Sequence, residues 1–172
     1  MFVRFFALLL TLCSFSTTSQ AETSIAQASA CFENMLNEAK AGASFSFMME
    51  RYVSYSGLAA QAVQVQKGLL WSELSDTARL PYIEAIKAYF AKEADKVRRG
   101  VGAKDYVDLG TITLQPRQHK KVKGAIQLAG TYKTVSAQRE NFGLTIVVKE
   151  NNCYVYDARW RDAWLSRFIS VP

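Results

Sequence analysis

Few residues of this chain have the types and the spacing that catalysis requires. His119 is the only histidine, and it lies in the run QPRQHKKVK, beside two lysines, which is typical of a solvated hairpin. A hydrolytic triad needs a histidine that can reach a nucleophile, and this position does not suit that role. No glycine-rich phosphate loop is present either. We therefore expect that the protein is not an enzyme and that it needs no cofactor.

Asp157 is the one carboxylate whose surroundings suggest a role. It stands inside an alternating segment among apolar neighbours, so it is either buried and paired or directed to solvent. Arg159 lies two residues away and therefore on the same face of a strand, which favours a surface or rim ion pair. A small enzyme that uses Asp157 and a tyrosine as acid and base is the least favoured alternative.

The first 21 residues have the pattern of a secretory signal peptide. Arg4 gives a short positive region, an apolar run from Phe5 to Leu12 follows, and Ser19-Gln20-Ala21 is a small-x-small cleavage site. We expect cleavage after Ala21. Residues 1–21 are then the signal peptide, and residues 22–172 form a single α+β domain.

The two cysteines that remain after cleavage are Cys31 and Cys153. In the oxidising compartment that an exported protein enters, an even pair favours a disulfide over two free thiols. Two cysteines and one histidine cannot supply a standard zinc site. We therefore predict a disulfide between these two residues and no metal.

The chain is basic. It carries 21 Lys+Arg against 15 Asp+Glu, and loss of Arg4 leaves 20 against 15, a net charge of about +5. A basic exported protein often meets an anionic surface, although solvated surface lysines explain the charge equally well. Four cations gather in one expected hairpin, and it has no interleaved aromatic residues for base stacking, so we expect transient membrane-surface contact and no nucleic acid. The head-group contacts are Arg117, Lys120, Lys121 and Lys123.

Helical periodicity dominates the first hundred residues. Apolar residues recur at helical spacing from Thr23 to Ala41, and further helices are expected through FMMERYV and through SGLAAQAVQVQKGLLW. The longest helix begins after Ser75, which is a suitable N-cap. Pro81 lacks an N–H donor and is expected to bend or restart this helix.

After Gly102 the hydrophobic period becomes two. Apolar residues hold the even positions from Val122 to Tyr132 and again from Phe142 to Val148, which is typical of half-buried antiparallel strands. A change of phase at Gly110 indicates a β-bulge. The last segment, NCYVYDARWRDAWLSRF, alternates first and then repeats aromatics every four residues, as a strand followed by a short helix does. We therefore expect N-terminal helices packed on one face of a curved four-stranded antiparallel sheet.

Three of these segments resemble one protein family. LSDTARLPYIEAIKAYF is similar to the Ser-Pro-x-Gln-Arg helix of the periplasmic phospholipid-binding proteins of the MlaC and toluene-tolerance type. Tyr154-Val155-Tyr156-Asp157 is similar to their last strand, and Arg51-Tyr52-Val53 resembles an earlier family segment. The family's acidic-glycine turn is replaced here by Trp160-Arg161-Asp162-Ala163-Trp164, and its further C-terminal helices are missing, which indicates a compact, divergent member.

The resemblance implies a cone-shaped fold like that of nuclear transport factor 2 and a periplasmic carrier of phospholipid or a related amphiphile. Such carriers serve an ABC transporter of the Gram-negative envelope, so the implied partners are a lipid and transporter components. Acyl chains need shielding from water, at about 0.8 kcal/mol per CH₂. The expected lipid-binding residues lie on the sheet face, on the helices opposed to it and among the aromatic residues nearby: Ile126, Leu128, Tyr132, Phe142, Leu144, Ile146, Met48, Ile86, Phe90, Tyr52, Tyr154, Tyr156 and Trp160.

Residue type alone cannot distinguish a lipid slot from a filled core. If the core is filled, the alternative function is a non-catalytic interaction module of an envelope assembly, with Trp160 and Trp164 as exposed anchors.

Overall fold

The computed structural model describes residues 24–172 except 104–105, 121, 123, 150–151 and 161–162. The expected signal peptide therefore lies outside the described residues. An N-terminal helix over residues 24–40 is followed by further helices and then by strands. In chain order these are α2 (Phe45–Tyr52), α3 (Tyr55–Lys67), the 3-10 turn η1 (Trp71–Glu73), α4 (Asp76–Arg98), β1 (Val107–Gln118), β2 (Ala125–Thr134), β3 (Arg139–Lys149), β4 (Asn152–Trp160), β5 (Ala163–Trp164) and α5 (Leu165–Phe168).

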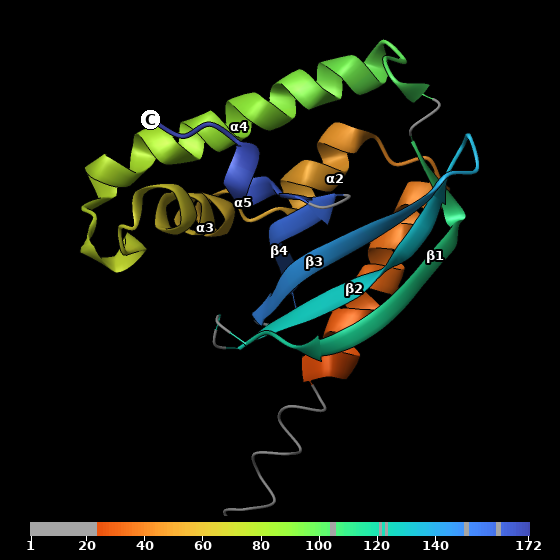
Figure 1. Cartoon of the computed structure of the whole chain (residues 1–172), viewed down its shortest axis with the longest axis horizontal. Coiled ribbons are helices and arrows are strands. Elements are labelled where there is room, and N and C mark those ends of the chain that lie inside the picture. The colour runs from red at the N-terminus through yellow and green to blue at the C-terminus, as the bar shows by residue number, and fades with distance from the viewer. Residues whose placement is uncertain (1–23, 104–105, 121, 123, 150–151, 161–162) are drawn as a thin grey trace, which may run out of the picture.

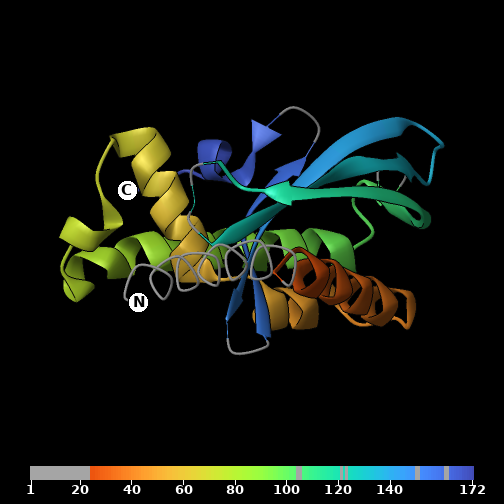
Figure 2. The ribbon, with the colours of Figure 1, turned by 90° about the horizontal axis from the view of Figure 1, so that it is seen from below.

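The fold is α+β, with an antiparallel sheet in the order β1-β2-β3-β4-β5. The predicted four-stranded meander is confirmed, and the two-residue strand β5 adds a short fifth member. In Figures 1 and 2 the N-terminal helix lies against one face of the sheet, while α4 is the outermost helix. Helix α4 packs on α2 and α3 rather than on a strand. Within the described part of the chain, no helix is long and apolar enough to span a bilayer.

Serine side chains begin three of the helices. Ser44, Ser54 and Ser75 each accept a hydrogen bond from the backbone N–H three residues ahead, which satisfies a donor that has no partner inside the helix. Pro81 does not restart the helix, since α4 continues through it. A proline in the second turn removes one backbone hydrogen bond, and the remaining bonds of this long helix hold it together.

The bulge predicted at Gly110 is confirmed. The β1–β2 register shifts between Asp108 and Thr113, and the N–H of Gly110 donates to the Asp108 carboxylate at 3.1 Å. On the facing strand, a Cβ at Gly130 would lie 1.7 Å from the carbonyl oxygen of Thr113. Only glycine permits this close approach of the two backbones.

The N-terminal helix fills the apolar face of the sheet. Ala28 and Phe32 from this helix are buried, and the Phe32 ring stacks on Phe142 with centroids 6.1 Å apart. Close packing of this kind leaves few voids larger than a water molecule. The buried members of this first cluster are Ala28, Phe32, Ile126, Leu128, Tyr132, Phe142, Ile146 and Val155.

A second cluster joins α3, α4 and the C-terminal segment. The expectation that Ile86 and Phe90 oppose the sheet is wrong, because both are buried in this second cluster instead. The periodicity of α4 predicted an apolar stripe but could not show which element the stripe packs against. In the structure α4 packs against helices α2 and α3. The buried members are Leu58, Ala59, Ala62, Ile86, Phe90, Ile169 and Val171.

Two polar side chains hold the short helix α5 in place. The Asp157 carboxylate accepts from the backbone N–H of Ser166 at 3.1 Å and from its hydroxyl at 2.5 Å. At the other end of α5, the Gln66 amide donates to the carbonyl oxygens of Ser166 and Ile169, both at 2.8 Å. These bonds supply partners for backbone groups that a helix end leaves unpaired.

The predicted rim pair between Asp157 and Arg159 is wrong. Asp157 is only 7% exposed, and its carboxylate bonds to Ser166 and to the N–H of Ala158. Burial raises the pKa of Asp157 above its ordinary value, against the lowering effect of these hydrogen bonds and of Arg167. The group is therefore a structural anchor of the C-terminal segment.

Candidate functional site

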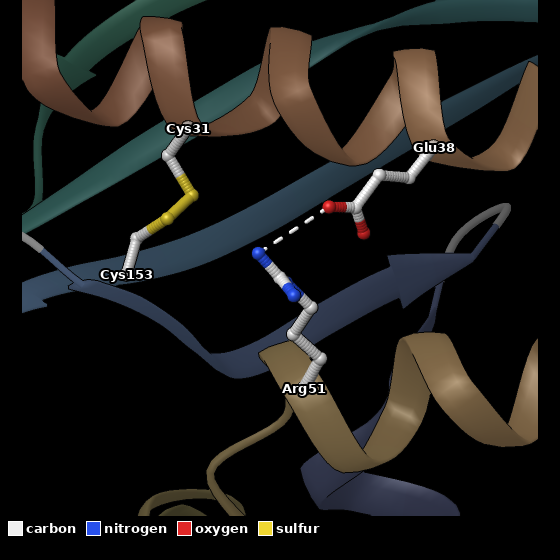
Figure 3. The surroundings of a disulfide bond; sticks show 4 residues. All are labelled: Cys31, Glu38, Arg51 and Cys153. Atoms are coloured by element: carbon white, nitrogen blue, oxygen red, sulfur yellow. Dashed lines mark ion pairs between the residues drawn. A yellow bond between two sulfur atoms is a disulfide. The ribbon is translucent and has the colours of Figure 1, made fainter. Parts of the chain in front are cut away.

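A pocket of about 390 Å³ lies where the N-terminal helix, α2 and β4 meet. Each of these elements contributes part of its wall, and Figure 3 shows its surroundings. The lining residues are Cys31 and Asn34 from the N-terminal helix, Arg51 and Tyr52 from the end of α2, and Asn152, Cys153 and Tyr154 from the start of β4.

The predicted disulfide between Cys31 and Cys153 is confirmed and forms one wall of this pocket. It joins the N-terminal helix to β4, with Cα atoms 6.2 Å apart and a sequence separation of 122. This Cα distance lies within the usual range for a disulfide. The bond therefore fixes the position of the helix that covers the sheet.

Arg51 is the charged residue among the described residues of the pocket lining. Its Nη2 atom lies 3.4 Å from Oε1 of Glu38 (Figure 3), and its guanidinium lies over the rings of Phe47 and Tyr52, at 5.8 and 5.5 Å from their centroids. Its side chain is 55% exposed. A guanidinium has five N–H donors, and its interactions with Glu38 and with the Tyr52 phenol do not occupy them all. Arg51 can therefore bind a further acceptor from the pocket.

Tyr52 provides a neutral phenol beside Arg51. Burial raises the pKa of Tyr52 above its ordinary value, and the neighbouring Glu38 adds to this rise while Arg51 opposes it. The phenol therefore keeps its proton at neutral pH and can donate a hydrogen bond.

A cluster of methionine side chains lies directly beneath this polar mouth. Cys31, Met48 and Tyr52 are its buried members, and Met35 and Met49 are among the partly buried ones. Two of the buried members, Cys31 and Tyr52, also line the pocket, so pocket and cluster are continuous. Methionine is unbranched and adaptable, and methionine-rich surfaces accommodate apolar ligands of varied shape. We call Met35, Met48 and Met49 the methionine cluster.

The sheet-face residues that the sequence proposed for a lipid slot are core residues here. Five of them, Ile126, Leu128, Tyr132, Phe142 and Ile146, are buried against the N-terminal helix, and Leu144 is partly buried beside them. The filled-core alternative therefore describes this face. Whether these side chains ever contact a lipid remains a prediction.

The remaining predicted lipid-binding residues lie in different parts of the structure, and only some of them are near the pocket. Met48, Tyr52 and Tyr154 belong to the pocket and the cluster below it. Tyr156 lies elsewhere, with its ring against Gly57 of α3, where a Cβ would come within 2.7 Å of ring carbons. Trp160 pairs with Phe142 through its backbone in the sheet, and its side chain is outside the described part.

The predicted basic hairpin lies at the same end of the sheet as the pocket. In an antiparallel meander the β1–β2 and β3–β4 turns share one end, and Asn152 of the pocket immediately follows the second of these turns. Arg117 is exposed near the end of β1 and donates to the Gln127 side chain at 2.9 Å. Lys120 is exposed in the turn, whereas Lys121 and Lys123 lie outside the described residues.

His119 has a structural place in this hairpin. Its Nδ1 atom accepts a hydrogen bond from the backbone N–H of Val122 at 2.9 Å. An imidazole nitrogen that accepts in this way carries no proton. The described residues contain no group of histidine, cysteine and carboxylate side chains that could hold a metal ion.

Sequence reasoning missed the polar lining of the pocket. Asn34 lies on a helix face that periodicity assigns to solvent, and Asn152 only begins the alternating last segment, where no role was predicted for it. Arg51 was noticed for its family-like segment, without a role. The one available signal was the cysteine pair, because a bridge between residues 31 and 153 requires their neighbours to meet.

Comparison with solved structures gives a distant structural similarity. No protein-family model matches the chain, and no curated protein is significantly similar in sequence. The structure is similar to that of a phospholipid-binding protein from Ralstonia solanacearum, solved in complex with a phospholipid. The TM-score is 0.49 and the sequence identity 14%, over 83% of this chain and 80% of that chain. Phospholipid binding is thus a property of the Ralstonia protein, and the similarity does not establish a ligand for this chain.

Proposed function

We propose that this chain is a carrier of a phospholipid or related amphiphile. The observation that carries the proposal is the pocket beside the disulfide, whose polar mouth is continuous with the methionine cluster. An amphiphile needs this combination, because its head group keeps polar partners while each buried CH₂ of its chains contributes about 0.8 kcal/mol.

The pocket volume sets a condition on how the ligand binds. A volume of about 390 Å³ is near the lower end for small-molecule sites, so it suits a head group rather than a whole two-chain lipid. The acyl chains then require the methionine side chains to move aside between the N-terminal helix and α2. The disulfide retains the N-terminal helix on β4 while this seam opens.

The finer proposal concerns the cellular setting. The sequence resemblance to the MlaC and toluene-tolerance type supports a periplasmic carrier that serves an ABC-type transport system of the Gram-negative envelope, after cleavage behind Ala21. The resembling segments lie in α4, in β4 and at the end of α2. The exposed cations Arg117 and Lys120, at the pocket end of the sheet, suit contact with an anionic membrane surface.

A second candidate function is supported by the filled sheet face. Because Phe32 and its neighbours occupy that face, a non-catalytic envelope interaction module that binds no ligand also fits the fold. Its proposed anchor Trp164 is partly buried, with its ring 3.3 Å from a Cβ built at Gly143. The amount of ligand bound to the purified protein distinguishes the two functions, because the carrier binds a lipid and the interaction module binds none.

Filling the methionine cluster should reduce lipid uptake. We expect Met48→Trp to lower phosphatidylglycerol loading from cyclodextrin by roughly tenfold, since loss of two buried CH₂ groups of the ligand already corresponds to that factor. Met48→Leu conserves volume and should load normally. Loading is measured by native mass spectrometry on folded protein.

Leu128→Trp is the matched control in the filled core. Leu128 is 0% exposed, so overpacking should cost about 1–3 kcal/mol of stability without changing loading of the protein that remains folded. Should Met48→Trp fail to fold, Met49→Trp at a partly buried position takes its place. A folded tryptophan variant that loads like the wild type would contradict the proposed site.

A further inference from the structure

We propose that the pocket beside the disulfide is an anion site, which binds a phosphate or phosphate ester through Arg51. Among the described lining residues Arg51 is the charged one, and the other polar ones, Asn34, Tyr52, Asn152 and Tyr154, all carry hydrogen-bond donors. A guanidinium surrounded by neutral donors matches the geometry of a phosphate group. The identification of that phosphate as a lipid head group rests on the proposed function.

The ion pair beside the pocket leaves Arg51 available for a ligand. Oε1 of Glu38 lies 3.4 Å from Nη2 of Arg51, whereas a strong Arg–carboxylate pair uses both oxygens at about 2.7–2.9 Å. Among the described residues, Oε2 of Glu38 is buried without a hydrogen-bond partner. Glu38 thus holds the guanidinium beside the pocket and also competes with an incoming anion for it.

The surrounding charges favour approach of an anion. Glu38 is not part of the lining, and none of the described lining residues is a carboxylate. The exposed cations Arg117 and Lys120 lie at the end of β1 and in the β1–β2 turn, at the same end of the antiparallel sheet as Asn152. Cations at this end of the sheet raise the local concentration of anions.

Two substitutions with opposite expected effects test the site. Arg51→Gln removes the cation and should weaken anion binding about tenfold or more, as expected for loss of a charge-assisted pair. Glu38→Gln removes the competing carboxylate and should strengthen anion binding. Arg98→Gln is the matched control, because Arg98 is an exposed, ion-paired arginine on α4. A merely structural ion pair would make the Arg51 and Glu38 variants change in the same direction.

The experiment has two arms, which use protein stripped of lipid. In the first, inorganic phosphate is titrated, and the side-chain amide signals of Asn34 and Asn152 are followed by nuclear magnetic resonance. In the second, phosphatidylglycerol or a diacylglycerol with the same acyl chains is delivered from cyclodextrin. We expect phosphatidylglycerol to load better than diacylglycerol, and Arg51→Gln to abolish this preference.

Each outcome separates the anion site from the carrier function. Phosphate binding that depends on Arg51, without lipid loading, supports a site for free phosphate and contradicts the carrier. Equal loading of both lipids, unaffected by Arg51→Gln, overturns the anion site and leaves the carrier standing. Binding of neither phosphate nor lipid overturns both.

Discussion

Loss of the Cys31–Cys153 disulfide is expected to lower the free energy of unfolding by about 2–4 kcal/mol. The bond closes a loop with a sequence separation of 122, and a long cross-linked loop restricts the unfolded chain strongly in the chain-entropy model. It also ties the N-terminal helix, which carries Phe32, to the strand at the edge of the pocket. We expect the variant Cys31→Ser/Cys153→Ser to lose lipid loading together with stability.

Chemical denaturation of the oxidised protein, the reduced protein and the double variant measures this effect. Reductant should destabilise the wild type and leave the double variant unchanged, which controls for other actions of the reductant. Intact mass with an alkylating reagent reports the thiols. Two alkylated cysteines in unreduced protein from an oxidising compartment would show that the bond does not form.

Truncation of the buried carboxylate Asp157 is expected to have a similarly large effect. Asp157→Ala leaves the N–H and the hydroxyl of Ser166 without their partner, and each buried unsatisfied group costs about 1–3 kcal/mol. We expect a loss of about 2–4 kcal/mol in the free energy of unfolding, with release of α5 from β4. Thermal and urea unfolding measure the loss, and hydrogen exchange locates it.

Asp157→Asn is the matched control, because it removes the charge and keeps the shape of the side chain. An amide can accept from the Ser166 N–H and donate to its hydroxyl oxygen, so this variant should retain most of the stability. If the alanine variant unfolds like the wild type, Asp157 does not anchor the C-terminal segment.

Asp157 should also contribute a pH dependence with a defined sign. Burial raises the pKa of this carboxyl in the folded protein above the ordinary value of 3.8. Between the ordinary and the raised pKa the folded state retains a proton that the unfolded state has released. The free energy of unfolding therefore falls as pH rises through this window and is level above it. Subtracting the pH profile of Asp157→Asn from that of the wild type isolates this slope, and a difference that rises with pH would contradict it.

The sequence predicted local features of this fold well, because their causes are local. The N-cap Ser75, the bulge at Gly110 and the even parity of the apolar strand residues depend on neighbours a few positions away. Each was recovered by the structure. The cysteine pair added one long-range contact, which compartment chemistry made predictable.

The partners of the apolar surfaces were not predictable in the same way. An apolar stripe shows that a helix is buried, but Phe32 of the N-terminal helix and Phe90 of α4 are equally suitable to cover the sheet. The structure assigns Phe32 to the sheet and Phe90 to the second cluster. Likewise, no period relates Asp157 to Ser166, so sequence spacing selected Arg159 as its partner.

The polar pocket was the least predictable feature. Its lining includes Asn34, Arg51 and Asn152 from three separate elements. None of these residue types by itself indicates a binding site in a sequence. Its existence depends on how the N-terminal helix docks on β4, which is a tertiary event.

Ligand content of the native protein tests the carrier function most directly. The chain is produced with its expected signal peptide in the periplasm of a Gram-negative bacterium, purified without detergent and examined by native mass spectrometry and lipid extraction. We expect one phospholipid or related amphiphile per chain, bound to protein with an intact disulfide. Folded, disulfide-bonded protein that is empty, and that stays empty when phosphatidylglycerol is supplied, would contradict the carrier function and support the interaction module.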